Sequence, residues 1–259
     1  MEGSLVQMDV YTAFRTMLEV KCIVLPGTIY DNQTHITWLL IGLFLFAEVL
    51  KIDPTSDTVS LLRQDNNEQL PEGRWKWHGG LRAGDKIFGF PNNADNVLVV
   101  DCSTQRVYTI GSKDMIRSGR HRADDRYKYL GGAATIDERY AYLFPCDAEQ
   151  VLRIDCQTEE LTLVGHLLLE GENKFQNGFA CRDGCLYGIP QRASGVLKIV
   201  PASETQTEDQ VDIVSCGAHM IGIKDKFEGG VMGSDGCVYC IPLRARSCVK
   251  IIPGPTLNV

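Results

Sequence analysis

The chain has 259 residues, 44% hydrophobic and 23% charged, and a formal net charge of −7 at pH 7. This composition excludes wholesale disorder and is typical of a soluble globular protein, with length enough for one large all-β domain or two smaller ones. The negative net charge argues against a nucleic-acid partner, because phosphate contacts need clustered lysine and arginine.

Residues 1–26 form an N-terminal segment in which LVQMDVY, Leu5 to Tyr11, is a candidate closing strand. A degenerate repeat over about 27–65 follows, with an apolar insertion at about 31–46. Its core, ITWLLIGLFLFA from Ile36 to Ala47, has twelve residues, short of the ~20 that cross a bilayer as a helix, so a membrane partner is not expected. Three interpretations stay open: a buried or docked segment, a membrane-associating element, or a retained intron or mispredicted exon.

One motif then recurs four times, at intervals of 52, 46 and 52 residues. Its copies are KWHGG at Lys76, KYLGG at Lys128, KFQNG at Lys174 and KFEGG at Lys226. Self-similarity at such a period indicates a repeat architecture. The glycine pair lets two backbones approach closely at the start of a strand.

Each copy continues in the same way, with an aromatic strand that ends in proline, an alanine three residues later, and a β-branched run. The prolines are Pro91, Pro145, Pro190 and Pro242, and the alanines are Ala94, Ala148, Ala193 and Ala245. Asp183-Gly184 and Asp235-Gly236 predict hairpins, and we expect Asp101 and Asp155 to fix turns between the last two strands. Four short strands per unit follow from this pattern.

A four-stranded unit in tandem predicts an all-β fold, a β-propeller of about five blades whose first and last blades are incomplete or degenerate. The repeats occupy about 27–65, 76–111, 128–165, 174–215 and 226–253 within a repeat region of 27–259. The sequence resembles the broad propeller class of the NHL, YVTN and WD-repeat families, and uncharacterised propeller-repeat proteins of protists and algae that share units such as GGxxxxDGxIYxIPxxAxxVLxID. This resemblance implies a fold and no activity. Either Leu5–Tyr11 closes the last blade or the chain lacks that blade's end.

The recurring lysines are the candidate ligand-binding residues, since a closed ring would place Lys76, Lys128, Lys174 and Lys226 at one height around the axis, where they could hold an anion. The competing and favoured interpretation is that each lysine lies over the adjacent blade and pairs with a carboxylate. His78 could line the axis. SKDMIRSGRHRADDR, Ser112 to Arg126, is either a docking loop, a phosphosite-bearing segment around Ser118, or a solvated loop.

The chain has ten cysteines, and several of them lie at equivalent repeat positions, as Cys102 with Cys156 and Cys185 with Cys237, which favours reduced thiols in a cytoplasmic protein. Cys237 and Cys240 form a lone CxxC within a strand, so no metal is expected there. We therefore expect a non-enzymatic scaffold or binding module without a cofactor, whose partner is a protein or a small anionic ligand. The alternative is a lactonase-like propeller hydrolase whose metal ligands would be Glu228, Asn177 and Asp101, although their spacing does not bring them together.

Overall fold

The fold is given by a computed structural model, which describes residues 8–9, 49–53, 56–62, 70–169, 171–203 and 206–256. In these ranges the regular structure is antiparallel strand apart from a short 3-10 helix at Ala218–Met220. No helix in these ranges is long and apolar enough to span a membrane. The apolar run Ile36–Ala47 lies outside the described residues, so its three interpretations stay open.

The strands form five sheets, here called blades 1 to 5 in chain order. Blade 1 contains β1 (Met8–Asp9), β2 (Val49–Asp53) and β3 (Thr58–Leu62). Blade 2 contains β4 (Trp77–Ala83), β5 (Lys86–Pro91), β6 (Val97–Asp101) and β7 (Arg106–Ile110). Blade 3 contains β8 (Tyr129–Ala134), β9 (Tyr140–Pro145), β10 (Val151–Asp155) and β11 (Leu161–Val164). Blade 4 contains β12 (Phe175–Ala180), β13 (Leu186–Pro190), β14 (Gly195–Val200) and β15 (Gln210–Ser215). Blade 5 contains β16 (Phe227–Met232), β17 (Val238–Pro242) and β18 (Val249–Ile251). The predicted fold class, with an incomplete first and last unit, is confirmed.

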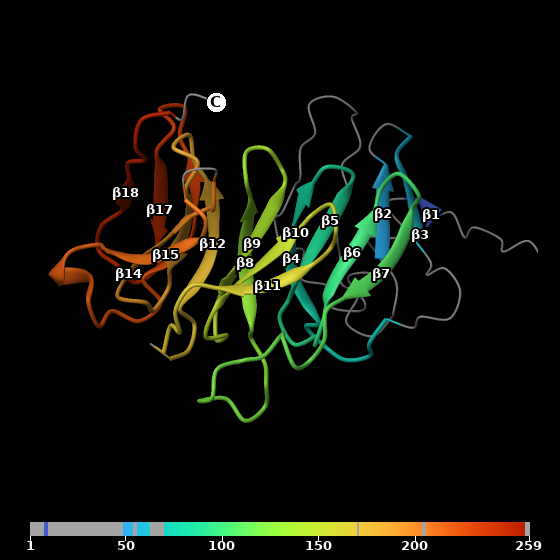
Figure 1. The fold of residues 1–259 in the computed structure, drawn as a ribbon, viewed down its shortest axis with the longest axis horizontal. Helices are drawn as coiled ribbons and strands as arrows, with labels where there is room; N and C mark the ends of the chain where they lie inside the picture. The colour runs from blue at the N-terminus through green and yellow to red at the C-terminus, as the bar shows by residue number, and fades with distance from the viewer. Residues whose placement is uncertain are drawn as a thin grey trace, which may run out of the picture.

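The blades stand side by side in a row, with blade 1 at the right-hand end of Figure 1 and blade 5 at the left-hand end. The first strand of each repeat lies against the first strand of the next, so that β4 meets β8, β8 meets β12, and β12 meets β16. These first strands form the inner wall, and the remaining strands of each blade extend outward from it.

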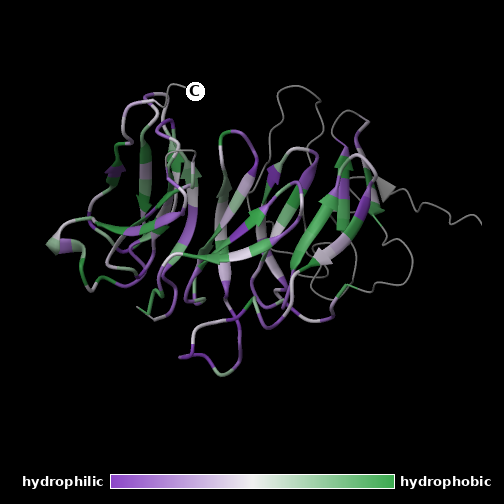
Figure 2. Ribbon diagram, in the orientation of Figure 1, coloured by the Kyte–Doolittle hydropathy of each residue, from purple (hydrophilic) through white to green (hydrophobic). Residues whose placement is uncertain are grey.

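The apolar core lies between the blades. Four clusters of buried side chains fill the spaces between consecutive sheets, one for each of the four junctions. Figure 2 shows hydrophobic residues along the strands and mostly hydrophilic ones in the connections at the lower edge. A single twisted sheet of this size cannot bury both faces, so each blade needs its neighbours for stability.

The glycine pair marks a β-bulge at the start of the first strand. The pairing register shifts at the same place in four blades, between Trp77 and Gly80, Tyr129 and Gly131, Phe175 and Gly178, and Phe227 and Gly230. A Cβ at Gly178 would lie 2.3 Å both from the Tyr187 carbonyl oxygen and from the Phe144 ring of the preceding blade. The close approach of backbones predicted for the glycine pairs is confirmed at Gly131, where a Cβ would lie 2.3 Å from the backbone nitrogen of Asn177 in the next blade.

The predicted turns are also confirmed. The Asp101 carboxylate accepts hydrogen bonds from the backbone N–H groups of Ser103 and Thr104 at 3.0 and 2.9 Å. Asp155 accepts in the same way from Gln157 and Thr158. Gly184 and Gly236 both have φ of +72°, as their hairpin turns require.

The described part of the N-terminal segment lies on the first blade. Met8 pairs with Val59 and Asp9 with Thr58, so β1 extends blade 1 at β3. These two residues do not join β18, which differs from the closure on the last blade suggested by the sequence. For the rest of Leu5–Tyr11 closure stays a prediction, since those residues are not described.

Candidate functional site

The four recurring lysines are buried and stand directly before the first strand of blades 2 to 5. Three of their ammonium groups donate to the carbonyl oxygen three residues earlier in the chain. These bonds are Lys128 to Asp125 at 2.6 Å, Lys174 to Gly171 at 2.9 Å and Lys226 to Ile223 at 2.9 Å. Burial lowers the pKa of Lys76, against the opposing effect of Glu72, and its ammonium lies 5.4 Å from the Trp77 ring centre.

Two of these lysines also reach the preceding blade. Lys128 donates to the carbonyl oxygen of Asn93 at 3.3 Å and to the Asp95 carboxylate at 3.3 Å, while Lys226 donates to the Arg192 carbonyl oxygen at 3.2 Å. Asn93 and Arg192 each stand two residues after a strand-ending proline. The ammonium groups therefore connect equivalent points of neighbouring blades. Anion binding by a ring of these lysines stays a prediction.

The lysine backbone connects the blades as well. The N–H groups of Lys128, Lys174 and Lys226 donate across each junction to the residue after the previous proline, at 3.0, 3.0 and 2.8 Å. Their acceptors are Asn92, Cys146 and Gln191. Main-chain hydrogen bonding thus continues from one blade to the next.

A third connection uses the residue before each lysine, which has a left-handed backbone in all four repeats. The φ angles are +55° at Trp75, +57° at Tyr127, +51° at Asn173 and +52° at Asp225. The side chain two residues after the previous proline binds this residue at three junctions. The pairs are Asn93 with the Tyr127 N–H at 3.3 Å, Asp147 with the Asn173 N–H at 2.6 Å, and Arg192 with the Asp225 carboxylate at 3.0 Å.

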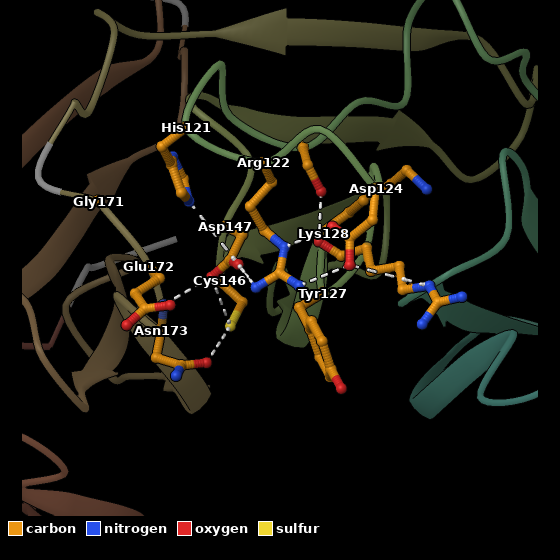
Figure 3. A network of polar contacts seen from close by, with 12 residues as sticks. His121, Arg122, Asp124, Tyr127, Lys128, Cys146, Asp147, Gly171, Glu172 and Asn173 are labelled. Carbon is orange, nitrogen blue, oxygen red and sulfur yellow. Dashed lines mark hydrogen bonds and ion pairs between the residues drawn. The ribbon is translucent and has the colours of Figure 1, made fainter.

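Asp147 is the most densely bonded member of this set (Figure 3). Its wholly buried carboxylate pairs with Arg122 at 3.0 Å and lies 3.7 Å from His121 Nε2. Arg122 also pairs with Asp124 at 2.9 Å, and this pair contributes to the rise in the pKa of the Arg122 guanidinium. The same guanidinium stacks on the Tyr127 ring at 4.7 Å. The network joins the loop before blade 3 to the junction between blades 3 and 4.

The loop Ser112–Arg126 hangs below blade 3 in Figure 1 and is held by further bonds. The Arg120 guanidinium pairs with Glu149 at 2.9 Å, and the Gly119 N–H donates to the Asp147 carbonyl oxygen at 2.7 Å. The Ser118 hydroxyl donates to the Arg126 carbonyl oxygen. Docking or phosphorylation of this loop stays a prediction.

A cavity of about 770 Å³ opens at the junction of blades 2 and 3, on the side where β4 and β8 begin. Its lining comes from residues 71–76, from 93–96, and from Asp124, Arg126 and Tyr127. Trp75 and Tyr127 are 37% and 38% exposed, and each follows an arginine, Arg74 and Arg126. At the same positions blade 4 has Glu172-Asn173 and blade 5 has Lys224-Asp225.

The sequence motif did not predict this cavity, although the difference between repeats that marks it is present in the sequence. The four copies of the motif are alike from the lysine onward and differ in the two residues before it, where two copies have arginine and an aromatic residue. Comparison of the repeats two residues further upstream would have found Arg74-Trp75 and Arg126-Tyr127.

The other candidate residues lie elsewhere. His78 is half-buried in β4, and burial lowers its pKa. Glu228 and Asn177 lie on the first strands β16 and β12, whereas Asp101 ends the third strand β6 and binds its own turn. In the described ranges no group of three or more His, Cys, Asp or Glu side chains could hold a metal ion. Free thiols are found at Cys237 and Cys240, as at the other described cysteines.

The arrangement of sheets defines the chain as a β-propeller, and comparison with solved structures agrees. A catalytically inactive virginiamycin B lyase from Staphylococcus aureus, solved with quinupristin, aligns with a TM-score of 0.58 at 10% identity over 90% of this chain and 74% of that one. A candidate 6-phosphogluconolactonase from Bacteroides uniformis aligns with a TM-score of 0.60 at 9% identity over 88% and 67% of the two chains.

An auxiliary nutrient binding protein from Bacteroides thetaiotaomicron aligns with a TM-score of 0.54 at 14% identity. The alignment covers 87% of this chain and about half, 54%, of that protein. No protein-family model and no curated protein matches the chain. At these identities the comparisons establish the propeller fold alone, and the likeness to protist and algal repeat proteins stays a prediction.

Proposed function

We propose that the protein is a non-enzymatic binding module and that its site is the cavity beside Trp75 and Tyr127. The observation that carries this proposal is the contrast between repeats. Every repeat has the buried lysine, and at three junctions its backbone N–H bonds to the preceding blade, whereas the two residues before the lysine change from blade to blade. The two Arg-aromatic copies line one cavity.

Backbone strain supports a role for these aromatic side chains. A non-glycine residue in the left-handed region costs about 1–3 kcal/mol, and asparagine and aspartate tolerate it better than bulky residues. Asn173 and Asp225 occupy this conformation in blades 4 and 5, so the fold is satisfied by small polar side chains. Trp75 and Tyr127 accept the greater strain, and their half-exposed rings contribute to the cavity wall.

The cavity also has the size and chemistry of a small-ligand site. A volume of about 770 Å³ falls within the roughly 300–1,000 Å³ of ligand pockets in proteins. Ligand pockets are lined mainly by hydrophobic and aromatic side chains with a few polar or charged groups, and Trp75, Tyr127 and the arginines provide both kinds. The propeller supplies a rigid wall for them.

A thermal-shift screen of a fragment library tests the proposal with wild-type protein and the double variant Trp75→Asn/Tyr127→Asn. Asparagine is the matched replacement, since it stands at the equivalent position of blade 4. A fragment present at ten times its dissociation constant stabilises the native state by about 1.4 kcal/mol, which raises the Tm by roughly 3–5 °C for a protein of this size. We expect fragments that raise the wild-type Tm and leave the double variant unchanged.

Two outcomes would overturn the proposal. One is a set of fragments that shift both proteins equally, which would place binding outside the cavity. The other is a hydrolytic activity of the purified protein that chelation abolishes and calcium restores, because that result would support the lactonase-like alternative.

A further inference from the structure

We infer that the cavity between blades 2 and 3 binds a small planar aromatic molecule that carries one anionic group. This inference rests on the proposed function and specifies the ligand of that site. It follows from the aromatic residues and the arginines in the cavity wall.

The aromatic rings come from equivalent points of adjacent blades. Trp75 precedes β4 and Tyr127 precedes β8, and these two strands lie side by side. Trp75 and Tyr127 are more than a third exposed, while their carbonyl oxygens accept from the N–H groups of Asn93 and Asp147 and the Arg122 guanidinium already lies 4.7 Å from the Tyr127 ring centre. Aromatic side chains held in this way offer stacking surface at little entropic cost, which selects a ligand with a flat ring.

The charged side chains in the wall are equal in number, the carboxylates Glu72, Asp95 and Asp124 and the cations Arg74, Lys76 and Arg126. Two of these carboxylates already pair with cations that lie outside the wall, Asp95 with Lys128 at 3.3 Å and Asp124 with Arg122 at 2.9 Å. The Arg126 guanidinium reaches Asp124 only at 4.0 Å.

Arg74 is exposed, and no hydrogen bond or ion pair of its guanidinium is found among the described residues. Arg74 therefore remains to receive an anion, and Arg126, which holds Asp124 only at 4.0 Å, can contribute a second guanidinium. Guanidinium groups bind carboxylate and phosphate with charge-assisted, often bidentate hydrogen bonds.

Calorimetric titration with two matched probe sets tests the inference, one for each source of the anionic group. The carboxylate set is indole-3-acetate, the neutral indole-3-acetamide, and acetate, which lacks a ring. The phosphate set is AMP, adenosine and ribose 5-phosphate. In at least one set the ring with its anion should bind at least about tenfold more tightly than either part alone, as expected for charge-assisted bonds added to stacking.

Four variants locate the binding. Arg74→Gln and Arg126→Gln should each weaken the charged probe about tenfold without affecting the neutral ring. Trp75→Asn should weaken both, with the Tm unchanged or raised because asparagine tolerates the left-handed backbone. Lys224→Gln, at the equivalent position of blade 5 and outside the cavity, is the control and should leave binding unchanged.

The inference would be overturned if the neutral rings bind as tightly as the charged ones. It would also be overturned if the affinity of the charged probes is the same for wild type and for both arginine variants. A failure of all probes in a protein whose fragment screen yields cavity-dependent ligands of another kind would overturn it too. In those cases the proposed binding function stands. If no fragment depends on Trp75 and Tyr127, the proposed function itself fails.

Discussion

Asp147 shows how much of the molecule depends on single polar side chains between blades. One carboxylate oxygen accepts from the Asn173 N–H at 2.6 Å and the other pairs with Arg122 at 3.0 Å, in a site closed to solvent. Removal of one partner from a buried pair leaves the other charge uncompensated. We expect Asp147→Ala to lower the free energy of unfolding by about 3 kcal/mol, measured by urea denaturation.

Asp114→Ala is the control for this prediction. Asp114 pairs with Arg117 at 3.1 Å, but its side chain is 93% exposed. An exposed pair contributes little, so its loss should cost less than about 1 kcal/mol. If both variants lower the free energy of unfolding by similar amounts, the buried Asp147 contributes no more to stability than an exposed ion pair.

Buried thiols predict a pH dependence on the alkaline side. Burial raises the pKa of Cys156 and of Cys240 to about 12, while an unfolded cysteine titrates near about 8.5. A thiol whose pKa is higher in the folded state contributes its full stabilisation at pH values below its pKa in the unfolded state. That stabilisation is lost as the pH rises above the unfolded-state pKa towards the folded-state pKa. The free energy of unfolding should therefore fall above about pH 8.5, by at most about 1.4 kcal/mol per pH unit for each thiol.

Unfolding titrations of wild type and Cys156→Ala at several pH values check this, because the variant should fall less steeply. Iodoacetamide labelling followed by mass spectrometry gives a second measurement. The exposed Cys248 should react first, and Cys156 and Cys240 only on unfolding. An equal slope in wild type and variant would mean that other groups control alkaline stability.

At the scale of strands, the bulge at each glycine pair decides how closely consecutive blades approach. Gly178 has both a carbonyl oxygen of its own blade and a ring of the preceding blade within 2.3 Å of its missing Cβ. Because the backbone cannot yield without shifting the bulge, Gly178→Ala should cost about 3 kcal/mol in urea unfolding. Gly254→Ala is the matched control, since its Cβ would meet Asp183 at an ordinary 3.4 Å, and it should be nearly neutral.

The same strands explain what the sequence could predict. Glycine pairs, strand-ending prolines and Asp-Gly turns each act through local backbone geometry, so four strands per repeat and the turn bonds of Asp101 were predictable. The left-handed backbone before each lysine was not. Tryptophan and tyrosine disfavour that conformation, which depends on contacts made by the fold, such as the hydrogen bond from the Tyr127 N–H to Asn93 of the preceding blade at 3.3 Å.

For the candidate site residues, too, the sequence showed what depends on local pattern and not what depends on the packing of blades. A lysine repeated in every copy was visible in the sequence, but its burial and its carbonyl partners depend on how blades pack. Arg74 and Arg126 lie 52 residues apart in the chain and meet in one cavity only because β4 and β8 are neighbours.

For the whole molecule, the row of blades makes its two ends different from its middle. The residue before the strand-ending proline packs on the next blade in each of the first three complete repeats, where Phe90, Phe144 and Ile189 are buried. A Cβ at Gly230 of blade 5 would lie 2.8 Å from Ile189. Ile241 occupies the equivalent place in blade 5 and is 50% exposed.

This difference gives a matched pair of substitutions at one repeat position. Ile189→Ala removes a side chain held between blades 4 and 5 and should cost about 3 kcal/mol, whereas Ile241→Ala should cost less than about 1 kcal/mol because its side chain is half in water. Urea unfolding of dilute protein measures both. If Ile241→Ala lowers the free energy of unfolding as much as Ile189→Ala does, the outer face of blade 5 is covered in solution. Unfolding measured over a range of protein concentrations would then show whether a second copy of the chain or a contact within the chain covers it. Only association makes stability depend on protein concentration.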